Sequence, residues 1–544
     1  MISSKRLLWN RYCAYRCDAP EIGLVLDISR VRFEDDYFTL MSSPISAAMD
    51  AMEALEAGAI ANSDEHRMVG HYWLRNPDLA PAENIGLDIK NVWESVHLFA
   101  AQLREGAIRG VDGPFEHVIH VGIGGSALGA QFLCEALQTS ADRMALHFLD
   151  NADPDGIDSL LEQLDGALGR TLISVVSKSG LTPTPQYVLL ELEAAYKRQG
   201  LDFARHAVAT TMKETDLERR ASREEWLARF LIWEWVGGRT SVTSAVGLLP
   251  AALQGIDIDP FLAGAATMDR LTRQRNPRAN PAALLALMWY WLGNGRGDKA
   301  MVVLPYKDRL ALLPRYIQQL AMESLGKKLN RAGVTVHQGL TVYGNKGSTD
   351  QHAYVQQLRD GIANFFVLFV SVHKDRTGPA IHIAPELTLG DYLFGSLEGT
   401  RNALYERGRD SITVSLADVT PFSLGALVAF FERAVGLYAE LINVNAYHQP
   451  GVDKWTADGV VELQRIVLAY LKNADAPLMA EEIAHSIGQT EQVETIYKLL
   501  EHLAKDPSRG IVVLPGLKPF TERFLKSRPS PTNSVLIKHN DSED

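Results

Sequence analysis

The strongest constraint on the fold of this chain is an alternation of short β-branched runs with segments of helical periodicity. Four such runs lie between residues 117 and 211, and helix-forming stretches separate them. A second block of the same texture begins at residues 299–306 and extends to about residue 419. Strands that alternate with helices are typical of parallel βαβ units whose sheet is covered by helices on both faces. The sequence therefore predicts an α/β fold with two doubly wound, mainly parallel sheets in series.

The segments that flank these two blocks have a different pattern. Residues 45–61 and 89–108 combine good helix formers with apolar positions at helical spacing, so we expect a helical N-terminal segment. Residues 421–444 are apolar enough to form a long helix over the second sheet, and the helix-like segments beyond residue 460 look like a winged-helix unit. The expected domains are the helical segment 1–110, the first α/β domain 111–290, the second α/β domain 291–460 and the C-terminal extension 461–544.

The composition disfavours several classes of protein. The 54 basic and 66 acidic residues give a net charge of −12, which argues against nucleic acid or an acidic membrane surface as the main partner. Cys13, Cys17 and Cys134 are too few for a disulfide framework, and the first two lack His or Cys neighbours at zinc-site spacing. The sequence shows no signal-peptide core, and no stretch approaches the ~20 apolar residues of a membrane span. We therefore expect a cytoplasmic protein without a bound metal.

A glycine-rich turn, GIGGSA at residues 122–127, follows the first strand of the first block. It satisfies the G-x-G-x-x-G/A pattern of dinucleotide-binding folds, and Asp150 at the end of the next strand suits a ribose. The physical content of the turn is broader, because glycines let backbone amides approach an anion and the next helix adds its N-terminus. The turn alone therefore leaves a dinucleotide and a smaller phosphate as alternatives.

A second polar loop, SKSGLT at residues 177–182, ends a later strand of the same block. With Ser126 of the glycine turn, its donors suit the three exposed oxygens of a phosphate monoester; they are Ser177, Lys178, Ser179 and Thr182. A pyrophosphate in a dinucleotide fold is bound mostly by backbone amides and needs no such cluster. The two loops favour a small phosphorylated ligand, and the alternative is an ordinary polar loop after a buried strand.

Five stretches in this order resemble the glucose-6-phosphate isomerase (phosphoglucose isomerase) family, whose two domains share the sugar-isomerase, or SIS, fold. The stretches are 62–75, 121–129, 177–182, 236–248 and, in the second block, 318–328 with 347–361. The resemblance implies that glucose 6-phosphate and fructose 6-phosphate are interconverted, as in glycolysis and gluconeogenesis, with a phosphorylated sugar as substrate and no cofactor. It also implies a homodimer with shared active sites.

The aldose–ketose reaction opens the sugar ring, removes a proton from C2 and returns it at C1 through a cis-enediol. By the resemblance, Glu323 transfers this proton, His352 from the partner subunit opens the ring, and Arg239 stabilises the enediolate with its fixed charge. The residues that the resemblance places in contact with the substrate are Gly125, Ser126, Ser177, Lys178, Ser179, Thr182, Gly238 and Gln319.

One position departs from the family pattern, which ends its catalytic set with a lysine in a stretch like FDQxGVExxK. Residues 447–456 are YHQPGVDKWT, so Thr456 stands at the lysine position and Lys454 two residues before it. A shift of two residues turns a helical side chain by about 200°. Either a local shift brings Lys454 into the site, or His352 opens the ring alone, or activity is impaired. We favour a reduced dependence on the lysine and keep Lys454 as a candidate catalytic residue.

Further alternatives stay open. The sequence leaves undecided whether an epimer such as mannose 6-phosphate is also accepted, and a non-catalytic phosphosugar sensor would use the same two folds. The C-terminal unit would suit a regulator if it bound nucleic acid. Glutamates in residues 480–484 and 490–497 stand where a recognition helix needs Arg or Lys. We therefore expect that unit to be a packing or assembly appendage.

Overall fold

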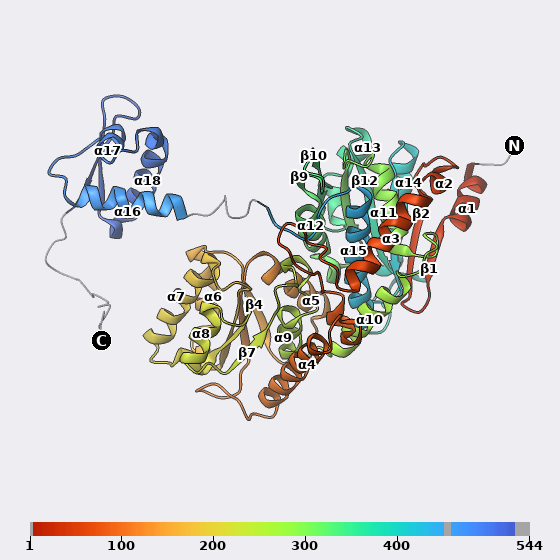
Figure 1. The fold of residues 1–544 in the computed structure, drawn as a ribbon, viewed down its shortest axis with the longest axis horizontal. Coiled ribbons are helices and arrows are strands. Elements are labelled where there is room, and N and C mark those ends of the chain that lie inside the picture. The colour runs from red at the N-terminus through yellow and green to blue at the C-terminus, as the bar shows by residue number, and fades with distance from the viewer. Residues whose placement is uncertain (1–3, 451–457, 528–544) are drawn as a thin grey trace. The chain divides into compact units, whose positions relative to one another are not determined.

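The computed structural model describes residues 4–450 and 458–527 (Figure 1). The chain divides into two compact units, Met1–His448 and Gln449–Asp544, and each is described by itself. Both sheets that the sequence predicts lie in the first unit. The boundary expected at residue 461 falls inside helix α16 (Asp458–Lys472), so the two units separate earlier in the chain than the composition suggests.

The first sheet consists of five parallel strands in the order β4-β3-β5-β6-β7. They are β3 (His117–Val121), β4 (Ala145–Leu149), β5 (Thr171–Val176), β6 (Ala207–Thr211) and β7 (Ala228–Leu231). β5 and β6 are buried along their whole length, because a parallel sheet covered on both faces has no solvent-facing side. The strand order reverses between β3 and β5, and the glycine turn and the SKSGLT loop follow these two strands. Open α/β sheets bind their ligands at such a point.

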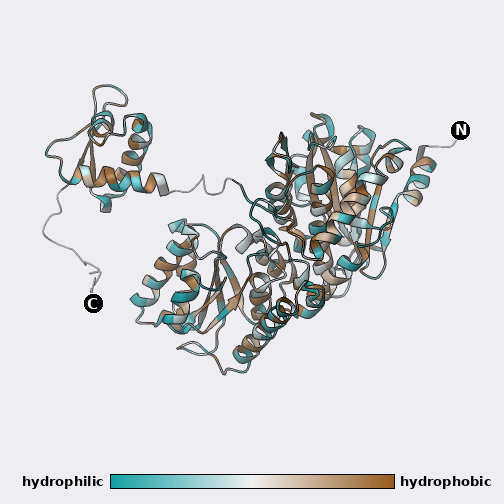
Figure 2. Ribbon diagram, in the orientation of Figure 1, coloured by the Kyte–Doolittle hydropathy of each residue, from teal (hydrophilic) through white to brown (hydrophobic). Residues whose placement is uncertain are grey.

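Helices surround this sheet. They are α4 (Glu83–Arg104), α5 (Leu128–Leu137), α6 (Pro154–Gln163), α7 (Pro183–Arg198), α8 (Asp216–Arg223) and α9 (Ala245–Gln254). Figure 2 shows hydrophobic residues along the strands, whereas the surrounding helices also carry hydrophilic ones. The one-sided hydrophobicity of α4 follows from this position, since Ile89, Val96 and Phe99 are buried while neighbouring positions face solvent.

The second sheet consists of six strands in the order β1-β2-β15-β12-β8-β11. The parallel members are β8 (Ala300–Pro305), β11 (Val342–Tyr343), β12 (Phe365–Val372) and β15 (Ser411–Leu416). Two short hairpins lie outside it, formed by β9 (Lys327–Leu329) with β10 (Thr335–Gln338) and by β13 (His382–Ala384) with β14 (Leu387–Thr388). Four strands of this sheet thus come from the block that the sequence assigns to the second α/β unit.

The N-terminal segment differs from its expected helical character. Besides α1 (Ser4–Ala14), α2 (Tyr37–Leu40) and α3 (Ser42–Glu56), it contains β1 (Arg16–Ala19) and β2 (Leu24–Arg30). These strands pair antiparallel with each other, and β2 continues antiparallel onto β15. The segment therefore completes the second sheet, because β15 would otherwise be an unpaired edge with exposed backbone groups.

A helical layer built around α15 (Pro421–Leu441) accompanies the second sheet. The other helices of this part are α10 (Ile258–Leu271), α11 (Pro281–Leu292), α12 (Leu313–Leu325), α13 (Val355–Asp360) and α14 (Leu389–Glu406). α15 packs most extensively against α10. It is also long and apolar enough to cross a membrane, contrary to the expectation from the sequence, but 94% of its apolar window is buried inside the fold. Its composition is that of a core helix.

The described part of the second unit contains α16, α17 (Ala480–Ser486), α18 (Val493–Lys505) and a hairpin of β16 (Ile511–Leu514) with β17 (Arg523–Lys526). It has a hydrophobic core of its own, which includes Val467, Ile483, Leu500 and Phe524. Three helices followed by a two-stranded hairpin are the elements of a winged helix. The role of this unit as an appendage stays a prediction.

Candidate active site

The glycine turn lies directly against the loop that carries Arg239. β3 ends at Val121, and the turn continues through a short 3₁₀ segment, Gly124–Ser126, into α5. A Cβ atom on Gly125 would lie 2.2 Å from the carbonyl carbon of Gly238, so only glycine permits this approach. The hydroxyl of Ser241 donates to the carbonyl of Gly125 at 3.1 Å. The glycine turn and the loop that carries Arg239 are therefore packed directly against each other.

Arg239 is almost fully buried in this assembly, with a side chain 5% exposed. Its guanidinium donates to the carbonyls of Ala446 (3.2 Å) and His448 (3.3 Å), and Nη2 lies 3.5 Å from Oε1 of Glu323. Burial lowers the pKa of Arg239, and the charges of Glu323 and Glu65 oppose that shift. Among the described residues, Glu323 is thus the one carboxylate that contacts this desolvated cation directly.

Helix α12 brings two further predicted residues to the same place. Gln319 and Glu323 are one helical turn apart and therefore share a face. The amide nitrogen of Gln319 lies next to Gly124 in the glycine turn, while Glu323 pairs with Arg239. The side chain of Glu323 is 21% exposed, so its carboxylate is accessible without being fully solvated. Together these contacts place an acid–base group between the turn and a buried cation.

The SKSGLT loop is arranged differently from the expected cluster of phosphate donors. Lys178 Nζ donates to the carbonyls of Glu234 (2.8 Å) and Val236 (2.7 Å), which lie just before Gly237 in the Arg239 loop. Burial, with Arg67 nearby, lowers the pKa of Lys178 to about 8. The ammonium group therefore holds the Arg239 loop through these two carbonyls. Fewer of its N–H donors are left to bind an anion.

The hydroxyls of the SKSGLT loop differ in their surroundings. Ser177 is buried, and its Oγ has no hydrogen-bond partner among the described residues. Ser179 is exposed and accepts a bond from the amide of Leu181 at 3.2 Å. Thr182 is half-buried at the N-cap of α7, with no capping bond from its side chain. Ser126 is half-buried in the glycine turn. The open donors are thus Ser126, Ser179 and Thr182.

Arg239 also lines a pocket of the first unit. This pocket is lined by the 62–71 segment, the loop after β7, α12, α15 and the residues that follow α15, with Glu65, Arg67, His71, Lys178, Arg239 and Ser324 among its polar members. The stretch at 62–75 supports the family resemblance, but the sequence assigns no role to its residues. Their position in the same pocket as Arg239 could not be predicted from motif spacing, because the contacts span more than a hundred residues of chain.

Of the other two expected catalytic residues, the structure describes only His352. His352 ends a 3₁₀ segment, Thr349–His352, is exposed, and does not line the pocket of its own chain. Lys454 and Thr456 lie outside the described residues. Before that gap, His448 contacts the site, because its backbone carbonyl accepts a hydrogen bond from Arg239. One subunit therefore brings together Arg239, Glu323, Gln319 and the glycine turn, whereas His352 of the same chain is not among the residues that line the pocket.

Sequence reasoning missed one buried cation at the site. Lys327 is 3% exposed and donates to the carbonyls of Glu323 (3.0 Å) and His448 (2.8 Å). The available signal was its place four residues after Glu323, which is one helical turn if the helix continues. The dinucleotide alternative, in contrast, loses support, because the carboxylate of Asp150 pairs with Arg315 at 3.3 Å.

Comparison with known proteins gives a family at the level of sequence and a similar fold among solved structures. The sequence model described as phosphoglucose isomerase matches residues 27–384. A glucose-6-phosphate isomerase from Geobacter sulfurreducens is 54% identical over 96% of this chain and 99% of its own length. One from Nostoc punctiforme is 53% identical over 93% and 97% of the two chains.

Among solved structures, a glucose-6-phosphate isomerase from Chlamydia trachomatis matches with a TM-score of 0.77 over 92% of this chain and 95% of its own, at 23% identity. That likeness concerns the fold, whereas the family follows from the near-full-length relatives and from the family match over more than half of the sequence. On both grounds, this chain belongs to the phosphoglucose isomerase family.

Proposed function

We propose that this protein interconverts glucose 6-phosphate and fructose 6-phosphate by moving a proton between C2 and C1. The observation that carries the proposal is the pair of Glu323 and Arg239, 3.5 Å apart, beside the glycine turn. Proton transfer through an enediolate needs a base near the C1–C2 edge and a cation where negative charge develops. The relatives named glucose-6-phosphate isomerase support the same pair of substrates.

The substrate is held by the two loops. Ser126, Ser179 and Thr182 bind the phosphate through their hydroxyls, with the N-terminus of α7 adding positive potential. Ser177 and Lys178 complete this loop, the lysine chiefly through the carbonyls it holds. Gln319 contacts the sugar hydroxyls beside the glycines at 125 and 238. Arg239 stabilises the enediolate, because a guanidinium keeps its proton at any working pH.

Ring opening is assigned to His352 of a second subunit. The exposure of this histidine and its absence from the pocket of its own chain support delivery across a dimer interface. An apolar surface of the β13–β14 hairpin and the start of α14 supports such an interface; its exposed members are Ile381, Ile383, Leu387, Leu389, Tyr392 and Phe394. The active enzyme is then a homodimer that shares its sites.

The remaining assignments follow the composition and the family. The protein acts in the cytoplasm, in line with its free cysteines, and needs neither nucleic acid nor a membrane. Lys454 is retained as a possible second group for ring opening. Because residues 451–457 lie outside the described part of the chain, kinetics of Lys454→Ala and Thr456→Lys on ring-closed and open-chain substrate decide between its alternatives.

A coupled assay with fructose 6-phosphate tests the proposed reaction. We expect turnover by the wild type and a loss of about 10²–10⁴ in kcat for Glu323→Gln, because the amide cannot carry the proton. Glu406→Gln, an exposed position at the end of α14, is the matched control and should keep wild-type activity.

Other outcomes of the assay point to other functions. A wild type without turnover that is thermally stabilised by the sugar phosphate supports a non-catalytic sensor. Stabilisation by a dinucleotide in place of the sugar phosphate supports an oxidoreductase.

A further inference from the structure

Lys327 occupies a turn that folds its side chain back under the helix carrying Glu323. α12 ends at Leu325, and Gly326 separates it from Lys327 at the start of β9. A Cβ atom on Gly326 would lie 2.6 Å from the carbonyl oxygen of Met322, so the turn is too tight for a larger residue. The ammonium group of Lys327 then reaches the carbonyl of Glu323 at 3.0 Å. A cation in this position satisfies a backbone acceptor that the helix leaves open at its C-terminus.

The same ammonium group also holds a segment from a distant part of the chain. Its second bond, of 2.8 Å, goes to the carbonyl of His448, which also accepts from Nη2 of Arg239 at 3.3 Å. The segment is tied at its other end by Asn445, whose amide donates to Asn62 at 3.0 Å. One carbonyl is thus shared by two buried cations, of which Arg239 also pairs with the carboxylate of Glu323 and Lys327 with its backbone carbonyl.

We propose that Lys327 is a positioning residue for the isomerisation, because its ammonium group ties the Glu323 end of α12 to the His448 carbonyl that also orients Arg239. The inference rests on the proposed function. It separates two tasks: Glu323 and Arg239 meet the reacting atoms, whereas Lys327 sets the distance between them without touching the substrate. Near-attack geometry is sensitive to such support, and a displacement of 1 Å can cost about 10² in rate.

The charge on Lys327 depends on its surroundings. Burial and the charge of Arg239 lower the pKa of Lys327 to about 7, while Glu323, Asp64 and Glu65 raise it. His448 faces the same ammonium group. Burial is the larger cause that lowers the pKa of His448, and the charge of Lys327 lowers it further. The hold on the two carbonyls is therefore strongest below neutral pH and weakens as the ammonium group loses its proton.

The experiment compares Lys327→Met, Lys327→Arg and the control Lys328→Met in full-length protein. Lys328 is the exposed neighbour in the same strand, and its variant should match the wild type. We expect Lys327→Met to lower kcat by about 10²-fold with a KM for fructose 6-phosphate within about threefold of the wild type, since the phosphate loops do not involve Lys327.

The pH profile separates positioning from a merely structural role. In the wild type, kcat should fall as pH rises through about 7, where the ammonium group deprotonates. That limb should be absent from Lys327→Met and displaced to higher pH in Lys327→Arg, which keeps its charge. If Lys327→Met does not fold, the pH at which kcat falls in Lys327→Arg, compared with the wild type, decides between the two roles.

Several results would overturn the inference. Unchanged kcat in a folded Lys327→Met, a change in KM alone, or an unaltered pH limb in both variants would each do so while leaving the proposed function intact. An inactive wild type would overturn both the proposed function and the inference.

Discussion

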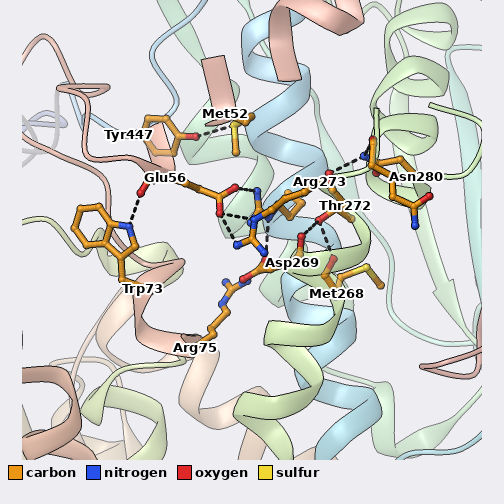
Figure 3. A network of polar contacts seen from close by, with 12 residues as sticks. Met52, Glu56, Trp73, Arg75, Met268, Asp269, Thr272, Arg273, Asn280 and Tyr447 are labelled. Carbon is orange, nitrogen blue, oxygen red and sulfur yellow. Dashed lines mark hydrogen bonds and ion pairs between the residues drawn. The ribbon is translucent and has the colours of Figure 1, made fainter. Parts of the chain in front are cut away.

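Two buried arginines of the first unit, Arg433 and Arg239, are held in opposite ways. Arg433 lies in a closed ionic network: its Nε is 2.9 Å from Asp269, and it pairs with Glu56. Asp269 also pairs with Arg75, at 2.9 Å (Figure 3). Burial lowers the pKa of Arg433, but Asp269 and Glu56 outweigh it, so the pKa lies above its ordinary value.

Arg239 shows the reverse balance. Burial lowers its pKa, and the charges of Glu323 and Glu65 do not restore it. Its contacts are long, between 3.2 and 3.5 Å, and go mostly to neutral acceptors. Burial alone therefore does not show that a charged side chain serves to stabilise the fold. A neutralised arginine stabilises the fold, whereas an incompletely neutralised one keeps its field for an anion that forms during the reaction.

Removing the neutralised arginine should give the largest effect. We expect Arg433→Met to lower the free energy of unfolding by about 3–5 kcal/mol, because the buried network that contains Asp269 and Glu56 is left one cation short, with Arg75 and Arg273 as their remaining partners. Chemical denaturation followed by tryptophan fluorescence measures it. Arg275→Met is the control, since this exposed arginine pairs with Asp50 and Glu53 at the surface and should leave the midpoint almost unchanged. Equal midpoints for both variants would contradict the structural role of the network.

Removing the other arginine should affect turnover more than folding. We expect Arg239→Ala to lower kcat by about 10²–10³, the usual cost of losing a group that stabilises the transition state. Its loss of stability should be smaller than that of Arg433→Met, since its acceptors are mostly carbonyls. Steady-state kinetics and denaturation of the same preparation measure both. Near-wild-type turnover would remove Arg239 from the catalytic set.

The smallest expected effect is a pH dependence of the unfolding free energy that comes from Lys327. The pKa of Lys327 is about 7 in the folded protein against an ordinary 10.5, so between these values the unfolded chain binds more protons. Stability from this group therefore rises with pH, by at most about 1.4 kcal/mol per unit, while the proposed hold on Glu323 is lost. The difference in unfolding free energy between wild type and Lys327→Met at pH 7 and pH 9 measures it. A difference that does not vary with pH would rule out the shifted pKa.

The sequence predicts the parts of the fold that depend on local pattern. The buried strands β5, β6, β8 and β12 are visible as apolar runs, and the two-sheet architecture follows from their alternation with helices. β1 and β2 are not visible in this way: β1 has only 4 residues and pairs with β2, while the other partner of β2 is β15, almost 400 residues further along the chain. Only tertiary pairing turns such runs into strands.

The candidate site shows the same limit. The resemblance predicts the roles of Glu323 and Arg239, whereas Ser126 is suggested by its hydroxyl in the glycine turn. The partners of Lys178 and the His448 partner of Lys327 are backbone carbonyls far away in sequence, which no side-chain pattern records. A lysine in a motif therefore predicts a nearby acceptor without telling whether the acceptor is ligand or protein.

The approach of Gly125 to Gly238 has a consequence for how sequences of this kind vary. The dinucleotide pattern demands glycine at position 122 and again at 124, but leaves position 125 free, whereas steric contact with the neighbouring loop demands glycine there. Position 125 thus acts as a spacer that sets how near the Arg239 loop comes to the glycine turn. In natural variants, any side chain at this position should be accompanied by a compensating change in the 236–239 loop, so that the two sites evolve as one.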